Sequence, residues 1–235
     1  MKSVILLGAE PKVGKTYIAS LLIQALKRSG QNPGYFKFAQ AGISSIEMSD
    51  AAAIQNKCNV GQELSEMLPY VYSENLPVHL AARESGNFIN PRVIQERFGW
   101  NVATHPVMVV EGTGEVICPL IMEDNQVLMQ EDLISRLKLN TVVVLRMSSS
   151  SLNQASLAVY YLRNIGFAPQ GIIVNGFDES NYAHCDACNL IERFTQTRII
   201  ATVGKNQRSL NLRCNLNEIF NPRALHGQTR AGRVD

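Results

Sequence analysis

The segment at residues 8–16 is the part of the sequence best suited to bind an anion. It reads Gly-Ala-Glu-Pro-Lys-Val-Gly-Lys-Thr and lies between an apolar run that predicts a buried strand and a run with helical spacing. A loop in this position points backbone N–H groups and the positive end of a helix at a phosphate. Lys15 would reach the terminal phosphates, and the Thr16 hydroxyl would ligate Mg²⁺, which prefers oxygen ligands.

This loop departs from the usual P-loop pattern at one position. Ala9 occupies the place of the first glycine, and Gly8 lies one residue too early. The alternative is a chance Gly-Lys-Thr at a helix start. The position directly after a buried strand disfavours that alternative and favours a nucleotide-binding loop.

Two acidic residues could complete a magnesium site beside the loop. Glu111 ends a predicted strand and is followed by residues 112–114, Gly-Thr-Gly, which predict a tight backbone suited to a ligand. Asp50 opens a short predicted helix. Nucleotide sites of this kind lie at the carboxyl ends of parallel strands, so both carboxylates could meet Thr16 there. The alternatives are that Asp50 only caps its helix and that Glu111 is a solvated strand end.

Strands alternate with helices along the chain. The predicted strands are residues 3–8, 34–38, 107–111, 142–145, 171–175 and 198–203. The predicted helices are residues 14–29, 50–56, 78–84, 91–101, 131–139, 150–165 and 182–194. Such alternation requires crossover connections and predicts an α/β fold, a mostly parallel, doubly wound sheet with helices on both faces.

The predicted domain organisation is simple. No repeat, low-complexity block or linker interrupts residues 1–220, which predicts a single P-loop NTPase-like domain. Residues 68–77, with two prolines, are predicted to be irregular. Residues 221–235 have little apolar content and are predicted to be a mobile tail.

The composition is that of an ordinary globular protein. Of the 235 residues, 46% are hydrophobic and 18% are charged, which excludes a disordered chain. The formal net charge of +2 comes from the tail, so no strongly basic face and no nucleic-acid partner are predicted. The longest apolar runs are far shorter than a membrane span, and no export signal is visible. We therefore predict a soluble, cytoplasmic protein without a membrane partner.

Cys185 and Cys188 form a Cys-x-x-Cys pair that does not by itself predict a metal site. A zinc site needs four ligands and usually a second such pair, and Cys214 is distant and isolated. An odd number of cysteines without an export signal indicates reduced thiols in a reducing compartment.

Taken in order along the chain, these landmarks resemble the dethiobiotin synthetase family. Six features of that family have counterparts here. Four are the loop Gly-Thr-x-Thr-x-Val-Gly-Lys-Thr, the strand end Lys-Pro-x-x-Ser/Thr-Gly, the helix start Ser-Asp and the segment Glu-Gly-Ala-Gly-Gly. The other two are a polar helix start that ends in Asn and an Asn at the end of a late strand. The matching segments are residues 8–16, 37–42, 49–50, 111–115 and 150–153, and Asn175.

The resemblance implies a homodimeric enzyme that converts 7,8-diaminopelargonate, CO₂ and ATP into dethiobiotin, ADP and phosphate. It implies Mg²⁺ held by Thr16, Asp50 and Glu111. It also implies catalytic roles for Lys15 and for Lys37, which would bridge the substrate carbamate and the γ-phosphate.

The resemblance further assigns nucleotide and substrate contacts. The nucleotide contacts are Lys12, Val13, Gly14, Lys15 and Thr16 at the phosphates and Asn175 at the adenine. The substrate contacts are Lys37, Ala41, Gly112, Ser150, Ser151 and Asn153, the last three holding the substrate carboxylate from the neighbouring subunit.

Four residues differ from the family pattern, namely Pro11, Lys12, Ala41 and Glu115. Pro11 removes a backbone N–H from the phosphate loop, and Glu115 adds a charge near the diamine. One alternative function is therefore a divergent or inactive nucleotide-binding homologue. Another is a nucleotide-dependent switch of the partitioning-ATPase type, although those loops carry an extra lysine before Gly-Gly, where this chain has Glu-Pro.

Overall fold

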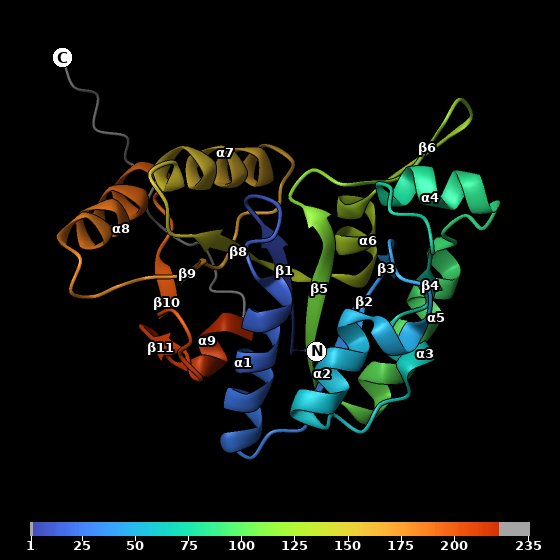
Figure 1. The fold of residues 1–235 in the computed structure, drawn as a ribbon, viewed down its shortest axis with the longest axis horizontal. Helices are drawn as coiled ribbons and strands as arrows, with labels where there is room; N and C mark the ends of the chain where they lie inside the picture. Colours follow the sequence, from blue (N-terminus) through green and yellow to red (C-terminus); the bar gives the residue numbers. More distant parts are fainter. Residues whose placement is uncertain (1, 221–235) are drawn as a thin grey trace.

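The structure is a computed structural model that describes residues 2–220. Its centre is a seven-stranded sheet whose order Figure 1 shows from left to right. From one edge to the other, the strands are β11 (Asn211–Leu212), β10 (Ile199–Val203), β9 (Ile172–Asn175), β8 (Asn140–Arg146), β1 (Lys2–Gly8), β5 (Val107–Glu115) and β2 (Pro33–Lys37). All neighbours pair in parallel except β10 and β11. The predicted mostly parallel α/β fold is confirmed.

The helices follow the predicted pattern, with short additions. They are α1 (Lys15–Arg28), η1 (Ile46–Met48, a 3₁₀ helix), α2 (Asp50–Cys58), α3 (Leu64–Met67), α4 (Val78–Ser85), α5 (Pro91–Thr104), α6 (Gln130–Leu137), α7 (Ser151–Asn164), α8 (Tyr182–Thr195) and α9 (Leu216–Phe220). Sequence patterns did not predict η1, α3 and α9, because segments this short carry too few residues to show a helical period.

Helices cover both faces of the sheet because side chains alternate along each strand. In β1, Ile5 and Leu7 belong to one buried cluster, together with residues of α4, α5, α6, α7 and α8. Val4 and Leu6 point to the opposite face and pack with residues of α1, α2, α3 and α9. A strand that is buried on both faces reads as a continuous apolar run, which is why β1 could be predicted.

Several strands differ from the sequence prediction. β5 does not end at Glu111 but continues to Glu115. Residues 68–77 are not wholly irregular, because β4 (Tyr70–Val71) pairs in parallel with β3 (Ala39–Gln40). A hairpin formed by β6 (Pro119–Glu123) and β7 (Gln126–Met129) was not predicted, although the intervening Asp-Asn pair is a turn signal.

Two further predictions concern the chain as a whole. Within residues 2–220, no helix is long and apolar enough to cross a bilayer. The predicted mobile tail at residues 221–235 lies outside the described residues.

Candidate active site

The loop between β1 and α1 has the backbone geometry of an anion cradle. Lys12 and Gly14 adopt left-handed backbone conformations, with φ of 56° and 93°. In the described part of the chain, the backbone N–H groups from Lys12 to Thr16 donate to no protein group. Unpaired donors at the start of a helix are the groups that bind phosphate. The loop also packs tightly at Gly8, where a Cβ would lie 3.0 Å from the Glu10 carbonyl oxygen and 3.1 Å from the Lys15 Nζ.

Neighbouring elements hold this loop in place. The Ala9 N–H donates to the Val144 carbonyl over 2.9 Å, and the Asn175 Nδ2 donates to the Val13 carbonyl over 2.8 Å. The Arg146 guanidinium donates to the Lys12 carbonyl. Each of these anchors is supplied by β8 or by the end of β9, so the strands beside β1 fix the loop from one side.

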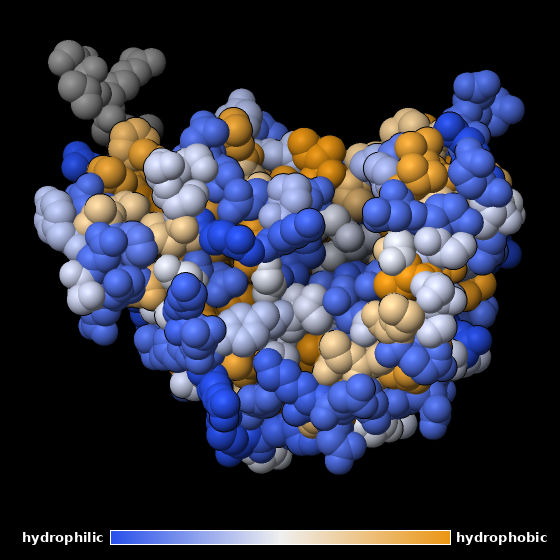
Figure 2. Space-filling model, in the orientation of Figure 1, coloured by the Kyte–Doolittle hydropathy of each residue, from blue (hydrophilic) through white to orange (hydrophobic). Residues whose placement is uncertain are grey.

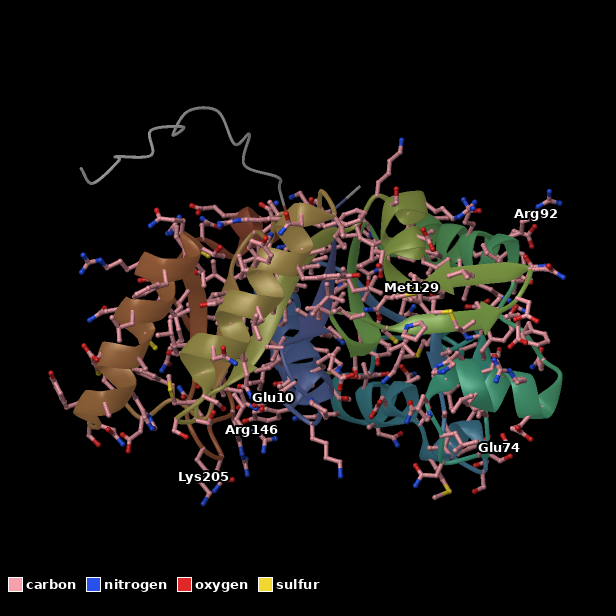
Figure 3. The ribbon with its side chains drawn as sticks, turned by 90° about the horizontal axis from the view of Figure 1, so that it is seen from above. Glu10, Glu74, Arg92, Met129, Arg146 and Lys205 are labelled. Carbon is pink, nitrogen blue, oxygen red and sulfur yellow. The ribbon has the colours of Figure 1, made fainter. Side chains whose placement is uncertain are left out.

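A second anchor connects the loop to α7. The Gln154 Nε2 donates to the Glu10 Oε2 over 2.5 Å. Figure 3 shows Glu10, Arg146 and Lys205 close together on one side of the molecule, near α7, with Glu74 well away from them. Figure 2 shows strongly hydrophilic residues over the region where β1 passes into α1, below α7. The loop therefore lies in a polar, charged part of the surface.

We expect Gly14→Ala to weaken nucleotide binding by about tenfold or more. A Cβ at Gly14 would lie 2.6 Å from the Asn175 Nδ2, and the left-handed backbone costs a non-glycine residue about 1–2 kcal/mol. Titration calorimetry with MgATP would measure the change in Kd. Gly30→Ala is the matched control, because Gly30 has φ of 77° but open space around it. Equal Kd values for Gly14→Ala and the wild type would contradict this account of the loop.

Thr16, Lys37, Asp50 and Glu111 meet beside the loop. The Thr16 hydroxyl donates to the Glu111 Oε1 over 2.9 Å. The Lys37 Nζ donates to the Asp50 Oδ2 over 2.5 Å and to the Glu111 Oε1 over 3.0 Å. Lys37 and Glu111 are direct partners in the register of β2 and β5, so the sheet itself brings them side by side. The structure thus brings together residues that are far apart in the sequence.

The structure distinguishes between the alternative roles predicted for Asp50 and Glu111. Ser49, not Asp50, caps α2, because the Ser49 hydroxyl accepts a hydrogen bond from the Ala52 N–H over 3.1 Å. Asp50 is the first helical residue, and its carboxylate is free to face Lys37. Glu111 is 2% exposed, so the reading of it as a solvated strand end is wrong.

The charges of this cluster are strongly coupled. Burial by itself would lower the pKa of Lys37, but the carboxylates of Glu111 and Asp50 outweigh it and raise that pKa. Lys15 differs, because burial lowers its pKa and the opposing effect of Glu111 does not restore it. A buried Lys37 ammonium between two carboxylates is thus held protonated at neutral pH.

The donor set of this cluster fits a magnesium ion. Mg²⁺ prefers oxygen ligands and is usually bound through one or two carboxylates, substrate phosphates and water. Asp50 and Glu111 provide the carboxylates, and the Thr16 hydroxyl lies within hydrogen-bond distance of Glu111. Within residues 2–220, no group of three or more His, Cys, Asp or Glu side chains could hold a metal, so at this cluster the protein would offer two carboxylates and the Thr16 hydroxyl.

The segment after Glu111, expected to be a tight backbone beyond the strand end, is a bulge within β5. Leu6 pairs with Glu111 and Gly8 pairs with Glu115, so β5 carries extra residues at this point. The buried Gln130 holds the bulge, accepting from the Thr113 N–H over 2.7 Å and donating to the Glu115 carbonyl over 3.1 Å. This role of Gln130 could not be predicted, because a glutamine at a helix start carries no sequence signal for it.

The predicted substrate contacts differ in accessibility. Ser150 and Asn153 are exposed, whereas Ser151 is buried, and its hydroxyl accepts from the Ser148 N–H over 2.7 Å. Ala41 is partly buried against the core. A Cβ at Gly112 would lie 2.9 Å from the Leu6 carbonyl oxygen, so this position requires glycine.

A cavity of about 1120 Å³ opens beside the phosphate loop. Asn175 lines it, as do Arg146 and Met147 at the end of β8. The remaining lining residues are Tyr17, Leu21, Gln24, Lys57, Gly176, Gly204, Lys205, Asn206 and Arg208. Most of them were missed from the sequence because they come from separate segments without a shared motif. A cavity of this size accommodates a nucleoside.

The Cys-x-x-Cys pair lies in α8, away from the carboxylate cluster. Cys188 is buried, and the Cys185 thiol donates to the Glu179 carbonyl over 3.5 Å. Burial raises the pKa of Cys188 to about 11, which keeps it a thiol at neutral pH. The pair contributes to the packing of α8 rather than to the site.

Comparisons with known sequences cover most of the chain. Residues 2–211 match the family model described as AAA domain. The ATP-dependent dethiobiotin synthetase BioD of Brachyspira hyodysenteriae is 31% identical over 202 residues, covering 86% of this chain and 91% of the relative. The enzyme of the same name from Clostridium novyi is 30% identical over 204 residues, covering 85% and 86%.

Comparisons with solved structures concern the fold alone. A ParA family ATPase from Chlorobium tepidum superposes with a TM-score of 0.52 at 15% identity, covering 88% of this chain and 86% of that one. The MinC:MinD cell division protein complex of Aquifex aeolicus gives a TM-score of 0.53 at 13% identity, covering 88% and 82%. Both likenesses agree with the nucleotide-binding α/β fold described above.

Proposed function

This chain belongs to the AAA-domain proteins and, among them, to the ATP-dependent dethiobiotin synthetases, and from that premise we propose that it is an ATP-dependent ligase of biotin biosynthesis. Its reaction forms dethiobiotin from 7,8-diaminopelargonate and CO₂. The observation that supports this most directly is the meeting of Lys37, Asp50 and Glu111 beside Thr16 of the phosphate loop. A partitioning-type switch is not favoured, because the likeness to such ATPases is one of fold only.

The reaction proceeds in three steps. One amine of the substrate adds to CO₂ and loses a proton, forming a carbamate. A carbamate oxygen then attacks the γ-phosphorus of ATP, and ADP leaves. The second amine attacks the carbonyl carbon of this mixed anhydride, inorganic phosphate leaves, and the ureido ring is closed. In the second step two anions must approach each other, so the site must supply positive charge and hold the nucleophile in line.

Lys37 and Lys15 are the proposed sources of that charge. Lys37 is buried and held protonated, and its ammonium lies beside the loop, where it can contact both the carbamate and the γ-phosphate. Lys15 begins α1 and is proposed to contact the terminal phosphates. The N–H groups of Lys12, Val13 and Gly14 would complete the phosphate contacts, since they have no protein acceptor among the described residues.

Thr16, Asp50 and Glu111 are the proposed Mg²⁺ ligands. The bound ion would neutralise phosphate charge and polarise the transferred phosphoryl group. The Asp50 side chain is 30% exposed and therefore accessible, whereas the buried Glu111 would contact the ion through Oε1, the oxygen that accepts from Thr16 over 2.9 Å. With such an ion bound, Lys37 no longer has to balance both carboxylates and can turn toward the substrate.

The nucleoside is proposed to lie in the cavity beside the loop, with the adenine at Asn175. The Asn175 Nδ2 is engaged with the Val13 carbonyl, which leaves the Oδ1 as an acceptor for the exocyclic amine of adenine. Guanine presents an oxygen at the corresponding position and would be disfavoured. The cationic Arg146, Lys205 and Arg208 surround this cavity and suit a polyanionic ligand.

The diamine is proposed to bind between Ala41 and Gly112 of one subunit and the start of α7 of a second subunit. Ser150, Ser151 and Asn153 would hold its carboxylate at the N-terminal end of that helix. Because Ser151 is buried with its hydroxyl engaged, its contribution would come from the helix start it stabilises. As the family resemblance implies, the carboxylate contact is proposed to come from a second subunit of a cytoplasmic homodimer.

We expect purified protein to release ADP when given MgATP, bicarbonate and 7,8-diaminopelargonate together, and to release little when the diamine is omitted. A coupled ADP assay measures the rate, and mass spectrometry of the organic product identifies dethiobiotin. A folded protein that binds MgATP but shows no diamine-dependent turnover would contradict the proposal. That result would instead favour a nucleotide-binding homologue without ligase activity, consistent with the departures at Pro11, Ala41 and Glu115.

A further inference from the structure

The hydroxyl of Tyr35 contacts a proposed metal ligand from inside the protein core. Tyr35 lies in β2, two residues before Lys37, and its side chain is fully buried. The hydroxyl donates to the Glu111 Oε2 over 2.8 Å. The phenol is the donor in this contact, because an ionised carboxylate only accepts.

This contact divides the two oxygens of Glu111 between two different environments. Oε2 accepts from Tyr35 within the core, whereas Oε1 accepts from Thr16 and Lys37 on the side of the phosphate loop. The terminal torsion of a free glutamate side chain rotates broadly, so without a donor behind it the carboxylate plane could turn and no oxygen would be held toward the loop. A buried carboxylate oxygen without a partner would also be costly.

The position of the Tyr35 backbone is itself fixed from outside the sheet. β2 is an edge strand, and the side-chain amide of Gln62 occupies its free edge. The Gln62 Oε1 accepts from the Tyr35 N–H over 2.7 Å, and the Gln62 Nε2 donates to the Tyr35 carbonyl over 3.0 Å. Gln62 also donates to Asn101, whose amide is in turn bound to the Arg97 carbonyl over 2.8 Å. The phenol therefore stands on a backbone that has little freedom to shift.

We propose that Tyr35 is a positioning residue for the divalent cation site: its hydroxyl holds Glu111 so that only Oε1 faces Thr16 and the bound ion. This inference rests on the proposed Mg²⁺ site and adds a residue that does not itself touch the ion, the nucleotide or the substrate. The consequence is that Glu111 acts as a ligand through one oxygen, and that its orientation is set before the cation arrives.

The test compares Tyr35→Phe with the wild type in direct binding of Mn²⁺. Free Mn²⁺ is measured by electron paramagnetic resonance during titration of the protein with a non-hydrolysable ATP analogue present. We expect the Kd for Mn²⁺ to rise about tenfold or more, in line with the loss of a partner behind a metal ligand. In the ligase assay, excess Mg²⁺ should restore most of the rate of Tyr35→Phe, because the cation affinity and not the chemistry is impaired.

Tyr72→Phe is the matched control. The Tyr72 hydroxyl is also buried and also donates over 2.8 Å, but to the Asn87 carbonyl, outside the site. It should lose a similar amount of thermal stability and keep the wild-type Kd for Mn²⁺. An unchanged Kd in Tyr35→Phe, or an equal loss in both variants, would overturn the inference.

The Mn²⁺ binding test of Tyr35 and the ligase test of the proposed function can give different results. A wild-type protein that binds Mn²⁺ tightly yet makes no dethiobiotin would contradict the ligase activity, and the Tyr35 comparison would still be decided by the binding data. A wild-type protein without Mn²⁺ affinity would overturn both the cation site and the role of Tyr35.

Discussion

Lys37→Ala is expected to lower kcat by about 100- to 1000-fold while changing the Kd for ATP little. Removing one preorganised charged or donor group that stabilises the transition state typically lowers kcat by this factor. The Lys37 ammonium is buried between Asp50 and Glu111, whereas the nucleotide is proposed to be gripped by the loop itself. Single-turnover measurements at saturating MgATP and diamine would give the loss in rate, and calorimetry with MgATP would give the affinity.

Two further lysine variants test the role of Lys37. Lys27→Ala is the matched control, because the Lys27 Nζ also makes two hydrogen bonds, to the Cys58 and Asn59 carbonyls, but at the other end of α1. It should keep the wild-type rate. Lys15→Ala should instead raise the Kd for ATP, so a loss of affinity in Lys37→Ala as large as that in Lys15→Ala would contradict the role of Lys37.

Folding must be checked in Lys37→Ala because two carboxylates lose their shared cation. A buried charge left without its partner can cost about 3–5 kcal/mol of folding free energy. Thermal melting with and without saturating Mg²⁺ measures this cost, which the cation should partly offset. Lys37→Met keeps most of the buried side-chain volume and should show the same loss of kcat if the missing charge is the cause.

Glu111→Gln is expected to weaken Mg²⁺ binding and to lower the ligase rate by about 100-fold or more. The substitution keeps the shape of the side chain but removes the negative charge that a hard cation needs, and metal ions contribute several kcal/mol to phosphoryl transfer. The dependence of the rate on Mg²⁺ concentration should shift to higher values. Calorimetric titration with Mn²⁺ in the presence of the ATP analogue would report the binding itself.

The matched control for this variant is Glu123→Gln. Glu123 pairs with Arg83 over 2.7 Å on the surface, far from the phosphate loop in the sequence and on the β6–β7 hairpin. Loss of such an exposed pair costs little, so the rate and the Mg²⁺ dependence should stay at wild-type values. A wild-type Mg²⁺ dependence in Glu111→Gln would exclude Glu111 as a ligand.

Local sequence patterns were sufficient for the longer helices, for the buried strands of the central sheet and for the phosphate loop. The apolar run of β1 and the helical spacing of α1 lie on either side of the loop, so strand, loop and helix could be predicted from adjacent residues. The shortest strands could not be predicted in this way. The strands at Ala39–Gln40 and Tyr70–Val71 pair only with each other, and a two-residue strand has no period to detect.

At the cluster beside the loop, local sequence patterns and the folded chain supply different information. The sequence determined that a lysine, two acids and a threonine stand at the ends of predicted strands and helices. The folded chain decided that Lys37 and Glu111 are register partners, that Ser49 rather than Asp50 caps α2, and that Tyr35 supports Glu111 from behind. Strand order, register and side-chain direction depend on contacts between distant segments, and periodicity along one segment carries no information about them.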